Sequence, residues 1–308
     1  MIWLAACTPS VPELSSVEYD LGEPASQLRF HEDGALFVLA GDRVYRIGAG
    51  GGAPVLIGDG ALSAVPVRRT GDVVVHTAQG EIRVWSPDGT AEIVVQNVFD
   101  VDGLRVSDDG ALAFWNDQFF NTYVLDLNLG LLRDLQFDGH LLGLSSDARQ
   151  ALIADGMWLN WYLVYTDVAH AVPVRYPAGD IVDIVIVGRD PRYAEVLPPE
   201  DGEGADWMLV ADGDGNVPLA ATTAGTWLQG AFTADGSTIL TVEALAEGDP
   251  VFARYTADLS EAEILGQGPL AALPLSTDDP ATAAPDGTAL AYPSAAGVTV
   301  IGHQPSSG

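Results

Sequence analysis

Lysine is absent from the 308-residue sequence, and all 13 basic residues are arginines. Without lysine the chain cannot form a Schiff base or supply the lysine of a P-loop phosphate-binding motif. The 43 acidic residues give a formal net charge of −30. A polyanion of this kind repels nucleic acid and anionic lipid surfaces. We therefore expect no nucleic-acid partner.

Cysteine is nearly absent as well. Cys7 is the sole cysteine, so neither an intrachain disulfide nor a cysteine zinc site can form. Leu4, Ala5, Ala6 and Cys7 resemble the lipobox of bacterial lipoproteins, which implies lipidation of the Cys7 thiol. The apolar stretch of a signal peptide is missing upstream, so residues 1–16 are interpreted as a truncated signal, lipobox and tether. The alternative is a lone thiol on a frayed terminus.

The lipobox resemblance predicts a location in the cell envelope, either lipid-anchored or periplasmic to extracellular. Beyond Cys7 the sequence contains no run of about 18 or more apolar residues, the length that a membrane-spanning helix requires. We therefore expect membrane contact through the lipid on Cys7 alone.

One short phrase recurs along the chain: an apolar strand, a turn built on Asp and Gly, and a second apolar strand. Asp-Gly favours tight turns because Gly accepts a positive φ and Asp caps its own backbone. The equivalent turn positions are Gly34, Gly71, Gly110, Ala148, Pro191, Gly236 and Gly287. They are between 37 and 51 residues apart, a period close to that of a four-stranded propeller blade.

These turns predict an all-β, seven-bladed β-propeller in residues 17–303, followed by a flexible tail at residues 304–308. The last repeat lacks a fourth strand, whereas Val17–Leu21 forms an orphan strand ahead of the first repeat. Pairing that strand with the last blade would close the ring and remove exposed sheet edges. The pattern resembles WD40-like propellers and the propeller of the Tol-system periplasmic protein, which implies a binding fold without naming a ligand.

The loops between second and third strands emerge on one face of a propeller, so residues from different blades can share a surface there. Aromatic and amide side chains gather in these loops of the third and fourth repeats. The candidate binding residues are Trp115, Asn116, Asp117, Phe119, Phe120, Trp158, Asn160, Trp161 and Tyr162. Aromatic faces supply contact area in such sites. The alternative is that these rings fill the wedge between neighbouring blades.

Metal-binding patterns are weak. Asp212, Asp214 and Asn216 resemble the opening of a calcium loop, but Thr223 stands where an EF-hand has its bidentate Glu. An ordinary tight turn explains the same residues. We therefore expect no cofactor, with calcium at these three residues as a minor hypothesis.

Catalytic motifs are missing from the sequence: it has no G-x-S-x-G elbow and no H-E-x-x-H pair. The sequence therefore favours a non-catalytic binding or scaffolding propeller of the cell envelope. We expect a monomeric lipoprotein whose partner is an envelope protein, a peptide or a glycan. The alternative is a carboxylate- or calcium-dependent hydrolase or lyase that acts at the mouth of the propeller channel, with Asp102 and Asp183 as candidate acids.

Overall fold

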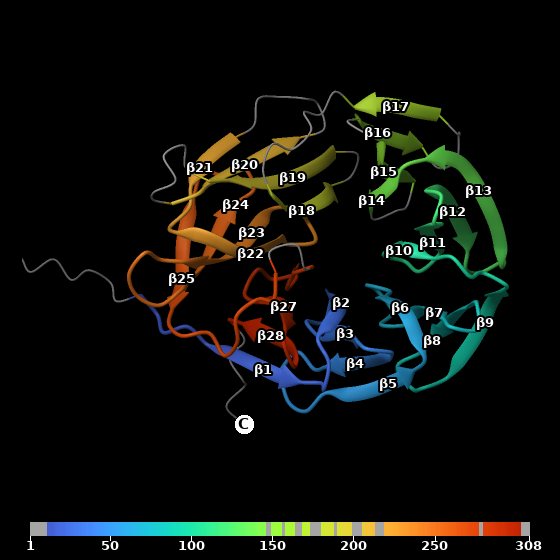
Figure 1. The fold of residues 1–308 in the computed structure, drawn as a ribbon, viewed down its shortest axis with the longest axis horizontal. Helices are drawn as coiled ribbons and strands as arrows, with labels where there is room; N and C mark the ends of the chain where they lie inside the picture. The colour runs from blue at the N-terminus through green and yellow to red at the C-terminus, as the bar shows by residue number, and fades with distance from the viewer. Residues whose placement is uncertain are drawn as a thin grey trace, which may run out of the picture.

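The computed structural model describes residues 11–302, apart from 146–148, 156–157, 164–167, 173–179, 188–189, 199–204, 213–218 and 277–279. Within these residues all regular structure is β-strand, arranged as seven four-stranded sheets (Figure 1). Neighbouring strands in each sheet run antiparallel. The described residues contain no helix that could span a membrane.

The first three sheets in chain order lie between residues 25 and 138. They consist of β2 (Ala25–Phe30), β3 (Leu36–Ala40), β4 (Arg43–Ile47) and β5 (Val55–Asp59); β6 (Ala61–Pro66), β7 (Val73–Thr77), β8 (Glu81–Trp85) and β9 (Ala91–Gln96); and β10 (Asp102–Val106), β11 (Leu112–Asn116), β12 (Asn121–Asp126) and β13 (Leu131–Asp138).

The next three sheets follow the same order of strands. They consist of β14 (His140–Leu144), β15 (Gln150–Asp155), β16 (Trp158–Leu163) and β17 (Val168–Val172); β18 (Asp180–Val187), β19 (Asp190–Leu197), β20 (Trp207–Asp212) and β21 (Leu219–Thr222); and β22 (Thr226–Phe232), β23 (Thr238–Ala244), β24 (Val251–Thr256) and β25 (Ala262–Gln267).

The remaining sheet combines the two ends of the chain. It is formed by β26 (Thr282–Ala283), β27 (Leu290–Ser294), β28 (Gly297–Ile301) and β1 (Ser16–Asp20). β1 pairs antiparallel with β28 over its whole length, with Ser16 opposite Ile301 and Asp20 opposite Gly297. The strand expected at Val17–Leu21 is therefore present, shifted by one residue, and lies beside the last strand of the chain.

The second strand of several sheets is buried on both faces. Every residue of β3, β7, β11 and β27 is buried, and their sequences are apolar almost throughout. Outer strands such as β5 and β9 are largely exposed. This pattern arises because each sheet packs face to face against its neighbours, and burial on both faces selects continuous apolar runs.

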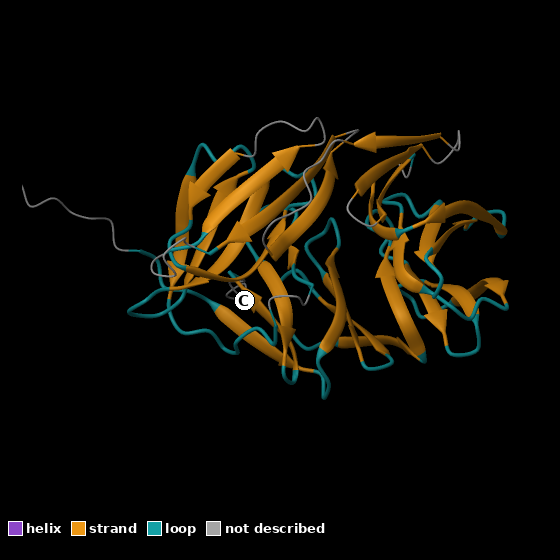
Figure 2. Ribbon diagram, turned by 45° about the horizontal axis from the view of Figure 1, so that its top comes forward, coloured by secondary structure: helices purple, strands orange, loops and turns teal. Residues whose placement is uncertain are grey.

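The innermost strands contact one another in sequence order: β2 with β6, β6 with β10, β10 with β14, β14 with β18, β18 with β22, and β22 with β26. β26 and β27 in turn contact β2. Figures 1 and 2 show the sheets arranged around a common axis. The expected all-β, propeller-like architecture is thus confirmed.

Turn positions expected from the repeat agree with the structure in most of the sheets. The five turn glycines lie between the first and second strands with φ between 65° and 81°, a backbone region that glycine adopts without strain: Gly34, Gly71, Gly110, Gly236 and Gly287. Ala148 lies outside the described residues. Pro191 is not a turn residue, because β19 begins at Asp190 and Pro191 pairs with Ile186.

Part of the segment expected to be a tether lies against the sheet of β22–β25. The Leu14 backbone amide donates to Gln267 O at 3.1 Å, and the Gln267 amide donates to Pro12 O at 3.0 Å. The Leu14 side chain is buried in the core shared by that sheet and the last one.

Candidate functional site

A cavity of about 750 Å³ lies between the innermost strands and is lined by residues from all seven sheets. This volume falls within the range of roughly 300 to 1,000 Å³ that is typical of small-molecule sites. We call it the axial cavity. Apolar and polar side chains from the innermost strands share its lining.

Among the side chains that the structure describes, the charged ones lining the axial cavity are Arg29, Arg68, Arg105 and Asp108. Three of the 13 basic residues thus gather in one cavity of a strongly acidic chain. Field lines focus in such a recess, where low-dielectric walls limit screening. The cavity therefore presents positive charge to a ligand although the molecule as a whole is negative.

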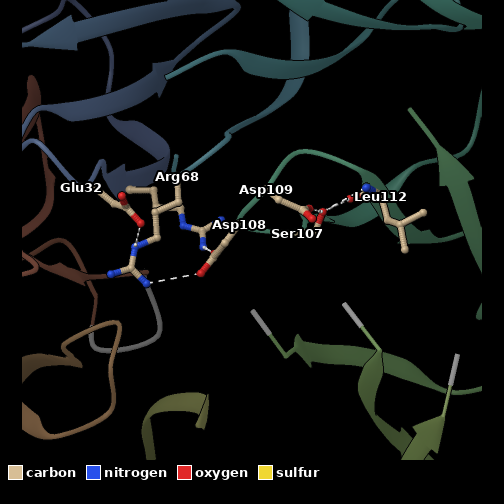
Figure 3. A network of polar contacts seen from close by, with 7 residues as sticks. Glu32, Arg68, Ser107, Asp108, Asp109 and Leu112 are labelled. Atoms are coloured by element: carbon tan, nitrogen blue, oxygen red, sulfur yellow. Dashed lines mark hydrogen bonds and ion pairs between the residues drawn. The ribbon is translucent and has the colours of Figure 1, made fainter. Parts of the chain in front are cut away.

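Asp108 is held between two arginines from two other sheets. Its Oδ1 accepts a hydrogen bond from Arg29 Nη2 at 3.0 Å, and its Oδ2 lies 3.5 Å from Arg68 Nη1. Glu32 Oε1 lies on the other side of Arg68, 4.0 Å from its Nε (Figure 3). The Asp108 carboxylate, which belongs to the third sheet, thus contacts arginines of the first and second sheets.

Local sequence explains how these side chains reach the cavity. Arg29 and Arg105 occupy the same place in their repeats, each as the penultimate residue of an innermost strand and opposite a phenylalanine of the second strand. Arg68 and Asp108 lie in the turns that follow β6 and β10. Those turns touch directly, because the Arg69 amide donates to Asp108 O at 3.1 Å.

The Asp108 turn is braced from its other side. Asp109 Oδ1 accepts hydrogen bonds from Ser107 Oγ at 2.7 Å and from the Ala111 amide at 3.0 Å. Ser107 Oγ in turn accepts from the Leu112 amide at 3.0 Å. Figure 3 shows Asp109 directed toward Ser107 and Asp108 directed toward Arg68. The two adjacent aspartates therefore have separate tasks, one in the turn and one in the cavity.

Burial affects the Arg29 guanidinium. Desolvation lowers the pKa of Arg29, Asp108 opposes this, and the like charge of Arg68 lowers the pKa further. Arg29 still keeps a third of its side chain exposed to the cavity, at 32%. An anion that enters the cavity would favour the charged form of Arg29, so the site is electrostatically suited to bind one.

The structure separates the binding residues expected in the third repeat into two groups. Trp115 is 1% exposed and stacks on Tyr123 with ring centroids 5.9 Å apart, so it is a core residue and not a ligand contact. Asn116 is buried too, since its Nδ2 donates to Gly139 O at 2.8 Å and its Oδ1 accepts from the Leu141 amide at 2.7 Å. For these two residues the expectation of surface exposure is wrong: they pack and bond between sheets.

Phe119 and Phe120 are exposed, as expected, and Asp117 organises the turn that carries them. Asp117 Oδ1 accepts from the Phe119 and Asn121 amides at 2.8 and 3.0 Å. These residues lie between β11 and β12, whereas the cavity arginines lie near the turns between first and second strands. Sequence reasoning placed the aromatic turn but missed the arginine cluster.

Several other expected site residues lie wholly or partly outside the described part of the structure. Cys7, Asp214 and Asn216 lie outside the described residues, and only the backbone of Asp212 is described, at the end of β20. In the fourth repeat the backbone of β16 pairs with β15 and β17. The side chains of four expected binding residues on this strand lie outside the described part of the structure: Trp158, Asn160, Trp161 and Tyr162.

The two candidate acids of the alternative enzyme hypothesis are Asp102 and Asp183. Asp102 is exposed and does not line the axial cavity, and the Asp183 side chain lies outside the description.

Comparison with known proteins gives a fold and no family. No protein-family description matches the sequence, and no curated protein is similar to it. The tricorn protease is similar in structure with a TM-score of 0.56 and 12% identity over 90% of this chain. This chain spans about a third of that protein, 33% of its length. An oligogalacturonate lyase in complex with manganese is similar with a TM-score of 0.62 and 10% identity, covering 94% of this chain and 90% of the lyase.

These comparisons correct the expectation of a non-catalytic binding or scaffolding protein. The lyase is an enzyme, and 90% of its length corresponds to 94% of this chain, so the missing sequence motifs do not support a non-catalytic role. Sequence motifs of this kind consist of residues close together in the chain. A propeller assembles its axial site from single residues of distant repeats.

The lyase structure contains manganese. Among the residues that this structure describes, no three His, Cys, Asp or Glu side chains gather where they could hold a metal ion. The described residues thus do not fit a metal of this kind.

Proposed function

We propose that the seven sheets are the blades of one closed seven-bladed propeller. We also propose that the chain is a lyase, which acts on a carboxylated oligosaccharide in the axial cavity. The pairing of β1 with β28 and the continuous contacts between innermost strands support the closed ring. The observation that carries the activity is the gathering of Arg29, Arg68 and Arg105 in the cavity of an otherwise acidic protein.

Guanidinium groups suit this substrate class because their planar donor pairs match a carboxylate. In a β-elimination a base removes the proton from the carbon that bears the carboxylate, a C=C double bond forms, and the glycosidic C–O bond breaks. The departing sugar oxygen takes up a proton from water. Negative charge develops on the substrate carboxylate during proton removal. Arg29 and Arg68 would stabilise that charge, and such electrostatic stabilisation is usually the largest contribution to catalysis.

The proposal is tested by incubating the purified protein with oligogalacturonate and with uncharged oligosaccharides of equal length. A lyase raises the ultraviolet absorbance of unsaturated product, whereas a hydrolase releases reducing ends without that absorbance. We expect the first result, and we expect Arg29→Gln with Arg68→Gln to reduce the rate at least a hundredfold. Arg46→Gln is the matched control, because Arg46 pairs with Asp33 at 3.0 Å but does not line the cavity. Turnover of the uncharged oligosaccharides alone would refute the proposal.

The envelope location and the lipid on Cys7 remain predictions. Mass spectrometry of the mature N-terminus tests them, because lipidation adds the mass of acyl chains to Cys7 and the Cys7→Ala variant cannot carry it. An unmodified N-terminus in envelope fractions would refute the lipid anchor.

A further inference from the structure

Three phenylalanines are exposed on two connections, one before β10 and one between β11 and β12, and a side-chain hydrogen bond joins these connections. Phe119 is 70% exposed, Phe99 is 65% exposed and Phe120 is 42% exposed. Phe99 lies in the connection between β9 and β10, and the other two lie in the turn between β11 and β12. We call Phe99, Phe119 and Phe120 the aromatic rim. Exposed apolar residues on adjoining segments are typical of interaction sites, whereas single exposed apolar residues need no explanation.

Hydrogen bonds bring the two segments of the aromatic rim together. Gln118 Nε2 donates to Asp100 Oδ2 at 3.3 Å, which joins the residue before Phe119 to the residue after Phe99. The Phe99 ring also lies so close to Gly80 that a Cβ there would come within 2.6 Å of it. Because Gly80 has no side chain, the Phe99 ring can lie against its backbone, and the ring remains largely exposed to solvent.

The other half of the aromatic rim is held in a strained conformation. Phe120 has a φ of 65°, in the left-handed region that bulky residues rarely adopt. Its amide donates to Asp117 O at 3.0 Å, its carbonyl accepts from the Gly139 amide at 3.1 Å, and its ring meets His140 edge-on at 4.3 Å. Strain of this kind persists where the surroundings fix it, and it often marks functional surfaces.

Carboxylates border the aromatic rim. Asp100 is exposed beside Phe99, and Asp117 lies at the base of the turn that carries Phe119. Burial opposes ionisation of Asp117, but hydrogen bonds from Asn121, Phe119 and Tyr123 outweigh it and lower the pKa of Asp117. Both carboxylates are among the 43 acidic residues that give the protein its net charge of −30.

We propose that the aromatic rim docks a peptide segment of a partner protein that presents apolar side chains interleaved with arginine or lysine. The rings provide rigid apolar area, and the bordering carboxylates complement the basic side chains. This inference goes beyond the proposed function, because the aromatic rim lies at the Asp102 end of β10 and the Asp108 cluster lies at its other end.

The test uses three synthetic peptides of equal length: alternating Arg and Leu, alternating Arg and Ser, and alternating Glu and Leu. Fluorescence anisotropy at physiological salt measures their dissociation constants for the full chain. We expect the Arg-Leu peptide to bind at least tenfold more tightly than either other peptide. In the double variant Phe99→Ser with Phe119→Ser we expect that advantage to disappear.

Leu129→Ser is the matched control, because Leu129 is 68% exposed in the turn at the opposite end of the same sheet, between β12 and β13. It should bind the Arg-Leu peptide like the wild type, and circular dichroism should show that all variants are folded. Equal affinity of the double variant and the wild type would overturn the proposal. So would binding of neutral oligosaccharides that is lost in the double variant. Neither outcome depends on whether the axial cavity is catalytic.

Discussion

Arg29 and Asp108 are 79 positions apart in the chain, yet their side chains meet at 3.0 Å in the axial cavity. The pair spans the intervening sheet, which contributes Arg68 to the same carboxylate at 3.5 Å. Because three sheets meet at one aspartate, that aspartate has a structural role in addition to setting the charge of the cavity.

Replacing Asp108 by Asn should therefore reduce stability. The change leaves Arg29 and Arg68 close together without their shared counter-charge, in a site where their side chains are 32% and 16% exposed. Water in the cavity screens part of the repulsion, so we expect the free energy of unfolding to fall by about 1 to 3 kcal/mol. Urea denaturation measures it.

The control is Glu263→Gln, which breaks an ion pair with Arg254 on the surface, where both side chains are substantially exposed. Its effect should stay below about 0.5 kcal/mol. If Asp108→Asn is as stable as wild type, the three-sheet bridge contributes nothing to the fold.

The repeat could be predicted from the sequence because most of its turns need a glycine with a positive φ at the same position. A glycine with positive φ between two apolar strands is a local signal, and it marked five of the turns. The register of β1 against β28 was less accessible, since it depends on a contact between the two ends of the chain. Even so, the pairing itself could be predicted, because the sequence has one unpaired strand near the N-terminus and one strand too few in the last repeat.

The candidate site was harder to predict because its residues are ordinary in isolation. Arg29 and Arg105 occupy equivalent positions, which a comparison of repeats aligned on the turn glycine could have revealed. The expectation that Trp115 is a surface residue was wrong because its position in the sequence does not determine which way the ring faces. An aromatic residue at the end of a second strand can face solvent or the neighbouring sheet, and only packing decides that it lies in the core.

A second prediction concerns Asn116. Its side chain bonds the Gly139 carbonyl and the Leu141 amide, so it links the third sheet to the start of the fourth. Asn116→Ala leaves two buried backbone groups without their partner, and we expect a loss of about 2 to 4 kcal/mol in the free energy of unfolding. Thermal unfolding followed by circular dichroism measures the change.

Gln96→Ala serves for comparison, because Gln96 Nε2 donates to Glu81 Oε1 at 3.1 Å on an exposed surface. We expect its unfolding free energy to stay within about 0.5 kcal/mol of wild type. Similar losses in the two variants would show that the Asn116 bonds are replaced by water.

A third prediction separates backbone strain from packing at the Gly110 turn. Gly110 has a φ of 71°, and a Cβ there would come within 2.9 Å of Val67 Cγ1, in the turn that follows β6. Gly89 has a φ of 86° but open space around it. Gly89→Ala should therefore lose about 1 kcal/mol from strain alone, and Gly110→Ala should lose more. Equal losses, measured by urea denaturation, would mean that the Gly110 turn is not packed against Val67.

The last prediction is a loss of stability in acid. Hydrogen bonds from Ser260 and Thr256 lower the pKa of Asp258 from 3.8 to about 2. Although burial opposes it, hydrogen bonds also lower the pKa of Asp33, Asp109 and Asp235. A carboxyl with a lower pKa in the folded state stabilises the fold above its unfolded pKa, and this contribution disappears as the pH falls through the folded value. The melting temperature should therefore fall as the pH decreases from about 4 to about 2.

Asp258→Asn tests the assignment, because Asn retains the turn hydrogen bonds without the titration. Its melting temperature should fall less steeply than that of the wild type over the same pH range. Glu247→Gln, which removes an exposed carboxylate in the loop after β23, controls for the loss of one negative charge and should keep the wild-type slope. If Asp258→Asn and Glu247→Gln change the slope equally, general charge repulsion dominates acid unfolding and the turn carboxylates do not.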